Sequence, residues 1–404
     1  MNERERVRPG TTADTRRTGG AGEVAALFLR LGFTAFGGPA AHIAMMREEV
    51  VRRRNWMSDE RFMDLIGVVN LIPGPNSTEL AIYLGYLRAG WPGLIAAGAC
   101  FIGPAMAIVL ALAWIYVTFG SAPQAGWILY GIKPIVIAII FQALWGLRRT
   151  VLRGPASIVI AAVVVALYLF GANTLVLLLG GGALIALERL AVRRRHPRDT
   201  PADATETAGP PALGGTLLPA AGTIATATVV PFSQATLFFT FLKIGAVLYG
   251  SGYVLLAFLR ADFVRHLGWL TDRQLLDAVS IGQFTPGPVF TTATFVGYLV
   301  GGLPGALLAT LAIFLPAFVF IPIIHRAATA LRRSPVTAAI LDGVNLAALA
   351  LMAGVTFQLG QSALRDPVTW ALALIALAVL LRVKLNSAWL IAAGGMVGLL
   401  ARGV

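Results

Sequence analysis

Charged side chains are scarce in this chain. Only 13% of its 404 residues are Asp, Glu, Lys or Arg, about half the fraction found in a typical soluble domain. Hydrophobic residues make up 57%, and the mean hydropathy is +0.78. About 20 apolar residues span a bilayer, and four longer windows hold no Asp, Glu, Lys, Arg or His: 89–132, 154–187, 278–324 and 343–364. These windows exclude a soluble protein and predict a polytopic integral membrane protein.

Cysteine is nearly absent as well, since Cys100 is the only one and lies in an apolar run. A disulfide framework is therefore excluded. The chain also lacks an HExxH motif, a nucleotide-binding P-loop and a nucleophile elbow, which are local signatures of metal, ATP and acyl-transfer sites. We therefore expect no metal, no cofactor, no ATP-driven step and no enzymatic activity.

Positive charge exceeds negative charge, with 32 Lys and Arg against 19 Asp and Glu. The arginines form short clusters between apolar segments, as at Arg52-Arg53-Arg54, which is typical of cytoplasmic membrane loops. This distribution argues against a nucleic-acid partner. Residues 1–23 lack the apolar core and cleavage site of a signal peptide, so we expect a disordered cytoplasmic tail there.

A set of short motifs occurs twice, about half the chain apart. The first copy is Trp56-Met57-Ser58-Asp59, Pro73-Gly74-Pro75, Gly85-Tyr86 and Gly90-Trp91-Pro92-Gly93. The second copy is Trp269-Leu270-Thr271-Asp272, Pro286-Gly287-Pro288, Gly297-Tyr298 and Gly302-Leu303-Pro304-Gly305. The offset is 213 residues up to the Pro-Gly-Pro triplet and 212 residues after it. A duplicated apolar chain with helix breakers inside its apolar segments is typical of secondary transporters.

Strand-type alternation is absent, so the sequence predicts an all-α fold. We expect a tail at 1–23, a first transport repeat at 24–190, a linker at 191–234 and a second repeat at 235–404. The linker is rich in Pro, Ala, Gly and Thr, a disordered composition. Its uncharged part, 213–232, leaves open one additional weak crossing.

Equivalent loops of the two repeats carry opposite charge bias. The loop at 116–126 has no Lys or Arg, whereas its counterpart has three arginines: Arg326, Arg332 and Arg333. Conversely, the next loop of the first repeat has Arg148, Arg149 and Arg153, and its counterpart has only Arg365 beside Asp366. Short cytoplasmic loops collect Lys and Arg, so the repeats are predicted to have inverted topology. The alternative is a chance bias in loops of this size.

The first two segments of each repeat are interrupted. In the first repeat, Gly37-Gly38-Pro39 breaks the segment 24–46, and Pro73-Gly74-Pro75 breaks 62–88. A complete crossing by 24–46 would place the Arg-rich tail and the next arginine cluster on opposite faces, and a re-entrant hairpin removes this conflict. Broken backbone is not tolerated against lipid, so we expect the breaks to be buried in protein or to line a cavity.

A Pro-Gly break inside a membrane leaves free backbone N–H groups at the start of the next half-helix. With the positive end of the helix dipole, these groups form an anion site that needs no charged side chain. First-turn hydroxyl and amide groups add donors suited to a tetrahedral oxyanion. A kinked structural helix is the alternative. The candidate anion-binding residues at the breaks are Gly37, Gly38, Pro39, Pro73, Gly74, Pro75, Asn76, Ser77, Thr78, Gly250, Pro286, Gly287, Pro288, Thr291 and Thr292.

Basic side chains near the breaks are further candidates. Arg30 and Lys243 match across the repeats, each seven residues before a glycine break, and either attract the anion or snorkel to the interface. Lys133 stands between two apolar windows and is a candidate for lining the anion path as an unpaired cation. His42 is a candidate for anion binding or proton transfer, or is a satisfied polar residue in the bundle.

Acidic residues near the breaks are further candidates, and they are matched between the repeats only in part. Glu79 follows the first Pro-Gly-Pro triplet, and Thr292 takes its place in the second repeat. An acid at membrane depth is a candidate for proton coupling, although Asn76 and Glu79 also have the spacing of a capping box. Asp64 and Asp277 lie near segment starts, where an acid complements the helix dipole, and we interpret both as structural.

The segment Phe33-Thr34-Ala35-Phe36-Gly37-Gly38-Pro39-Ala40-Ala41-His42, with the Trp-x-Ser-Asp and Pro-Gly-Pro motifs, resembles the chromate ion transporter family. Both repeats match, as in its long two-domain members. The resemblance implies export of chromate across the cell inner membrane, chromate resistance, sulfate as a related oxyanion, and halves that face oppositely. The second repeat departs from this pattern at Gly250-Ser251-Gly252-Tyr253 and has no histidine matching His42.

We therefore expect a multi-pass oxyanion exporter that works by alternating access, driven by proton exchange or by the membrane potential. Its expected partners are chromate or sulfate and the lipid bilayer, and a homodimer is left open. The alternatives are a passive anion channel, a transporter of a different oxyanion such as sulfate, and a membrane enzyme.

Overall fold

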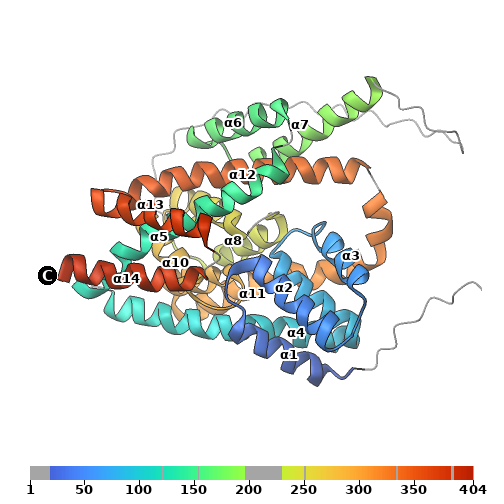
Figure 1. Cartoon of the computed structure of the whole chain (residues 1–404), viewed down its shortest axis with the longest axis horizontal. Coiled ribbons are helices and arrows are strands. Elements are labelled where there is room, and N and C mark those ends of the chain that lie inside the picture. The colour runs from blue at the N-terminus through green and yellow to red at the C-terminus, as the bar shows by residue number, and fades with distance from the viewer. Residues whose placement is uncertain are drawn as a thin grey trace, which may run out of the picture.

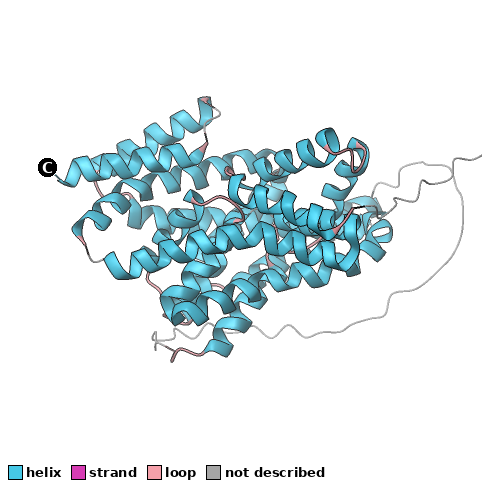
Figure 2. Cartoon of the chain, turned by 90° about the horizontal axis from the view of Figure 1, so that it is seen from below, coloured by secondary structure: helices cyan, strands magenta, loops and turns pink. Residues whose placement is uncertain are grey.

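The computed structural model describes residues 19–120, 122–152, 154–195, 230–249, 252–333, 335–383 and 386–403. Within these ranges every regular element is a helix (Figure 2). Four described helices are long and apolar enough to cross a membrane: α4 (Asn76–Phe119), α5 (Pro123–Val151), α11 (Thr292–Arg333) and α12 (Pro335–Ala363). The prediction of an all-α polytopic membrane protein is confirmed.

The same order of elements occurs twice. The first repeat consists of α1 (Ala21–Thr34), α2 (Gly38–Arg47), the π-helical segment η1 (Glu48–Arg53), α3 (Asp59–Val69), α4, α5, α6 (Pro155–Leu169) and α7 (Thr174–Arg195). The second consists of α8 (Gln234–Val247), η2 (Gly252–Val254), α9 (Leu255–Leu259), the π-helical η3 (Arg260–His266), α10 (Asp272–Phe284), η4 (Val289–Thr291), α11, α12, α13 (Pro367–Arg382) and α14 (Ser387–Gly403). Residues 1–18 and 196–229 lie outside the described residues, so most of the expected tail and linker, with its additional crossing, stays a prediction.

The first hairpin of repeat one is formed by α1 and the α2–η1 helix. Arg30 pairs with Glu49 at 2.5 Å, and Glu23, near the start of α1, accepts from the indole of Trp56 at 3.1 Å. Contacts between the start of one helix and the end of the next mean that the two run antiparallel. The expected re-entrant hairpin is therefore present, with Gly37 at its tip in a left-handed conformation (φ 106°).

The second hairpin has Pro73-Gly74-Pro75 at its tip, between α3 and the first part of α4. Arg88, at the end of this part, lies 3.0 Å from Glu23 and 4.9 Å from the centre of the Trp56 ring. Both of those residues lie at the open end of the first hairpin, where α3 also begins. The chain therefore returns to the face from which it started.

A further reversal separates the two parts of α4. Gly90 has φ 64° and ψ −144°, a conformation that favours glycine, and beyond it the helix folds back. A Cβ added at Gly85 would lie 2.3 Å from the carbonyl oxygen of Gly93, so the two parts cross with only glycine between them. Gly302 repeats the reversal in α11, with φ 61°. Close crossing and reversal explain the duplicated Gly-Tyr and Gly-x-Pro-Gly motifs.

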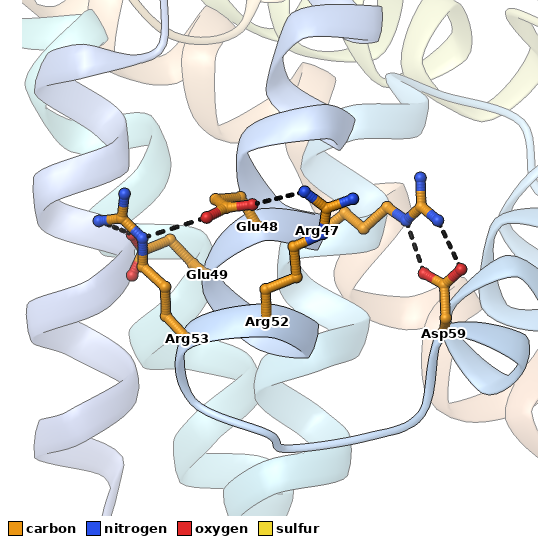
Figure 3. Close-up of polar contacts among 6 residues, drawn as sticks. All are labelled: Arg47, Glu48, Glu49, Arg52, Arg53 and Asp59. Carbon is orange, nitrogen blue, oxygen red and sulfur yellow. Dashed lines mark hydrogen bonds and ion pairs between the residues drawn. The ribbon is translucent and has the colours of Figure 1, made fainter.

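The Trp-x-Ser/Thr-Asp motif fixes the open end of the hairpins. Ser58 caps α3, and Thr271 caps α10 through a full capping box. The following Asp59 accepts two hydrogen bonds from Arg47, at 2.6 and 2.5 Å (Figure 3). The equivalent pair in repeat two, Arg260 and Asp272, has distances of 2.7 and 2.9 Å. Bidentate pairing of this kind holds orientation as well as distance.

The two repeats interlock rather than lying side by side. Helices α6 and α7 of the first repeat pack on α12, while α13 and α14 of the second pack on α5. The equivalent helices α4 and α11 pack on each other, and their C-terminal ends lie at opposite ends of the molecule (Figure 1). Equivalent helices thus run in opposite directions, which is the predicted inverted topology.

Replacement of Gly85 by valine is expected to force the two parts of α4 apart. The added carbons would overlap the Gly93 carbonyl, and overpacking of this kind costs about 1–3 kcal/mol. Thermal unfolding of the purified protein in detergent would show a lower melting temperature. Gly103→Val is the matched control, because a Cβ at this position in the same helix meets nothing within 4 Å. Equal melting temperatures for the two variants would contradict the crossing.

Candidate functional site

A cavity of about 790 Å³ lies where the tips of the hairpins converge. It extends from the tips toward the end of α5 and the start of α12. Its lining combines both repeats and consists of Gly37, Gly38, Pro39, Ala40, His42, Ile43, Asn70, Leu71, Pro75, Asn76, Ser77, Gln142, Ala143, Gly146, Leu147, Val151, Gly252, Tyr253, Pro288, Val289, Phe290, Ala338, Leu341, Asp342 and Asn345. We call it the central cavity.

Two reciprocal hydrogen bonds join the tips across the repeats. The amide of Gly74 donates to the carbonyl of Leu248 at 2.7 Å, and the amide of Gly287 donates to the carbonyl of Ala35 at 2.8 Å. Leu248 and Ala35 are the residues that end α8 and α1. Each Pro-Gly-Pro triplet is therefore held by the opposite repeat, which buries the broken backbone as membrane depth requires.

The first turn of α4 presents backbone donors to the central cavity. Its N-cap is Pro75, and no side chain caps the helix, so the amides of Asn76 and Ser77 are among the donors that the helix itself cannot satisfy. The Asn76 side chain donates instead to Asn70, at 2.8 Å. The alternative interpretation of Asn76 and Glu79 as a capping box is wrong.

The Pro286-Gly287-Pro288 tip of the second repeat offers fewer hydrogen-bond donors to an anion. The hydroxyls of Thr291 and Thr292 donate to the carbonyls of Pro288 and Val289, at 2.7 and 2.8 Å. Both threonines are buried, and neither lines the central cavity among the described residues. Thr78 is likewise fully buried in the first repeat. Of the predicted hydroxyl donors, only Ser77 reaches the cavity.

His42 and Ser77 form a buried pair at the wall of the cavity. His42 Nε2 lies 3.0 Å from the Ala35 carbonyl oxygen, and Nδ1 lies 3.2 Å from the Ser77 hydroxyl. A carbonyl only accepts, so Nε2 carries the hydrogen. In the neutral ring, Nδ1 then accepts from Ser77. The pair therefore fixes both the histidine tautomer and the direction of the serine hydroxyl.

The predicted basic candidates lie away from the central cavity, whose described lining contains no Lys or Arg. Arg30 pairs with Glu49 at 2.5 Å, and the matching Lys243 pairs with Asp262 at 2.7 Å. These two ion pairs are equivalent and brace the first hairpin of each repeat. Gly250 lies outside the described residues.

Lys133 is also paired. Its ammonium lies 2.9 Å from Asp277, which in addition accepts from the Tyr116 hydroxyl at 2.9 Å. The prediction of an unpaired cation in the span is wrong, because a lysine and an aspartate that are far apart in sequence meet between α5 and α10. Asn345 of the second repeat matches Lys133, and Asp64 of the first repeat matches Asp277.

Glu79 lies behind the Pro73-Gly74-Pro75 tip and is fully buried. Within the described part of the chain, neither of its carboxylate oxygens has a hydrogen-bond partner. The side chain folds back on the tip, since a Cβ added at Gly74 would lie 2.4 Å from Oε1. An ionised carboxylate in such surroundings is costly, so the site favours the protonated acid.

Sequence reasoning missed several polar residues that line the cavity: Asn70, Gln142, Tyr253 and Asp342. Gln142 carried a usable signal, because it is polar within the apolar α5. Nothing in the sequence indicated that it would face the tips rather than another helix. No three His, Cys, Asp or Glu side chains within the described ranges cluster as metal ligands would.

Comparisons with known proteins agree with this architecture. The sequence profile of the family described as Chromate transporter matches residues 22–187 and 235–399, one match for each repeat. The chromate transport protein of Cupriavidus metallidurans is 34% identical over 93% of this chain and 91% of its own length. The probable chromate transport protein of Synechococcus elongatus is 32% identical over 87% of each chain. No solved structure matches. With both repeats matched and nearly full-length relatives, the chain belongs to the chromate transporter family.

Proposed function

We propose that this protein exports chromate from the cytoplasm across the inner membrane and thereby gives chromate resistance, with sulfate as a related substrate. The observation that carries the proposal is the convergence of Gly37, Pro75 and Pro288, tip residues from both repeats, on one cavity. The anion binds there, against the first turn of α4. Three of the supporting relatives carry chromate transport in their names.

Backbone dipoles rather than charged side chains hold the dianion. The described lining has no Lys or Arg, and the free amides at Asn76 and Ser77 lie at the positive end of a helix dipole. Gln142, Asn70 and Asn345 add amide donors around the same space. A site without fixed positive charge releases its anion more readily, which a carrier needs at each turnover.

The charge distribution assigns the sides of the membrane. The central cavity reaches the end of α5 that bears Arg148 and Arg149, and short cytoplasmic loops collect arginine. The cavity therefore opens to the cytoplasm. Further toward the start of α5, Lys133 pairs with Asp277 of α10 at 2.9 Å, and in our proposal this pair closes the path. Closure at one end supports an alternating-access carrier over a passive channel, which needs a continuous pore.

Inverted repeats require the linker to join chain ends on opposite sides of the membrane. Beyond its hairpins, repeat one has four further helical segments, the second part of α4 with α5, α6 and α7. If these all cross, the repeat begins and ends on the cytoplasmic side. A second repeat of opposite orientation must begin on the other side. An additional crossing within the expected linker, at 213–232, would satisfy this condition, and it stays a prediction because most of these residues, 213–229, lie outside the described ranges.

His42 and Ser77 make anion binding sensitive to protons. In the neutral state the Ser77 hydroxyl donates to His42 Nδ1 and is not available to the anion. A second proton on His42 makes Nδ1 a donor, so the Ser77 hydroxyl turns and donates to the oxyanion. The anion and the proton then stabilise each other in the cavity.

Ser77→Ala is expected to raise the KM for chromate about tenfold, the effect of losing one hydrogen bond to a charged ligand. The measurement is uptake of radiolabelled chromate by proteoliposomes. Ser280→Ala is the matched control, because the Ser280 hydroxyl donates to its own helix at Leu276 and does not line the cavity. An unchanged KM for Ser77→Ala would place the anion elsewhere.

Glu79 couples transport to the proton gradient. Its carboxyl is protonated while buried behind the tip, and it releases the proton when rocking of the repeats hydrates this region. The membrane potential adds a second driving force, because it acts on a dianion with about 2.3 kcal/mol per charge per 100 mV.

Glu79→Gln is expected to weaken the response of chromate flux to an imposed pH gradient, leaving the part that depends on His42 and the response to voltage, because glutamine keeps the shape and cannot release a proton. Flux into proteoliposomes is measured with the voltage clamped and then with the pH clamped. The control is Glu48→Gln, which removes a surface acid that pairs with Arg52 and Arg53. A pH response in Glu79→Gln equal to that of the wild type would refute coupling through this residue.

A further inference from the structure

A second cavity, of about 680 Å³, lies at the opposite end of α5 from the central one. Lys133 contributes to its lining, nine residues before Gln142 of the central cavity, which is about 13 Å along a helix. The other lining residues are Pro123, Gly126, Trp127, Tyr130, Thr271, Asp272, Arg273, Leu276, Ser362, Ala363, Arg365, Asp366 and Thr369. We call it the outer cavity.

Three basic side chains line the outer cavity. Arg273 and Arg365 are exposed, and neither forms an ion pair with a described residue. Lys133 lies deeper, with its side chain 12% exposed, and faces Asp277. The basic groups are thus arranged from the exposed part of the cavity to its buried part.

The acidic groups on the same wall are already engaged. Asp272 accepts both hydrogen bonds of the Arg260 guanidinium, at 2.7 and 2.9 Å. Asp366 accepts from the Tyr130 hydroxyl at 2.7 Å and caps α13. Arg260 compensates the charge of Asp272, whereas the Tyr130 hydroxyl that donates to Asp366 is neutral. Arg273, Arg365 and Lys133 together still outnumber Asp366 and Asp277, so the outer cavity has a net positive charge.

We propose that the outer cavity is a second binding site for a small divalent oxyanion, distinct from the central cavity. Arginine guanidinium groups match the oxygens of a tetrahedral oxyanion in two-point hydrogen bonds. The anion sits between Arg273 and Arg365, and its charge attracts the Lys133 ammonium away from Asp277. Occupancy of the outer site thus weakens the ion pair that closes the path.

The outer site rests on the proposed function only for the identity of its ligand. No symmetry-related copy of this site is expected, because Asn345 stands at the position that matches Lys133. The site therefore belongs to one side of the membrane, the side on which an exported anion leaves. The outer cavity thus supplies the basic side chains that the described lining of the central cavity lacks.

The test is equilibrium dialysis of the purified full chain in detergent against radiolabelled chromate. The wild type is expected to bind two chromate ions, and Arg273→Gln/Arg365→Gln is expected to bind one. The control is Arg61→Gln/Arg382→Gln, which removes the same net charge at two exposed arginines outside both cavities and is expected to bind two. If the double variant aggregates, Arg365→Gln alone is expected to weaken the outer site about tenfold.

The outcomes separate the two sites. If Arg273→Gln/Arg365→Gln binds as many ions as the wild type with the same affinity, the outer site does not exist. If the wild type binds one ion, which this variant loses and Ser77→Ala keeps, the outer site stands and the proposed central site is wrong. Equal losses in both arginine variants would reduce the effect to general electrostatics and overturn the outer site.

Discussion

The centre of this protein depends on two backbone hydrogen bonds, from Gly74 to Leu248 and from Gly287 to Ala35. An unpaired backbone group at membrane depth costs several kcal/mol, so a broken helix is tolerated there only where a partner is supplied. Each repeat supplies the partner for the other. Glycine is favoured at both tips, because Gly74 and Gly287 have φ angles of 137° and 87°, which residues with a Cβ rarely adopt.

Charge and dipole have separate tasks in this arrangement. Ion pairs such as Arg47–Asp59 (Figure 3) and Arg30–Glu49 lie along the flanks and open ends of the hairpins and fix their geometry. The tips carry no described lysine or arginine into the central cavity, so in the proposed binding mode the anion would meet backbone amides. At this central position, lysine or arginine side chains would slow the release of a dianion toward the outer cavity, whereas a helix terminus would bind it more weakly.

The duplication has left the two repeats alike in shape and different in chemistry. The reversals at Gly90 and Gly302 have similar backbone angles, and α3 and α10 both start at a hydroxyl N-cap. The buried polar groups differ between the repeats. Thr292 matches Glu79, and Asn345 in the position of Lys133 leaves the Lys133–Asp277 pair without an equivalent.

The sequence by itself determined the all-α class, the two repeats and the re-entrant breaks. Apolar length, proline and glycine act on the backbone locally, so their effects can be read without knowing what lies nearby. Only the tertiary structure decided which side chains meet. Lys133 was expected to be unpaired and contacts Asp277, and Gln142 faces the tips. Pairing depends on positions brought together by packing over long sequence separations, and no local pattern encodes those distances.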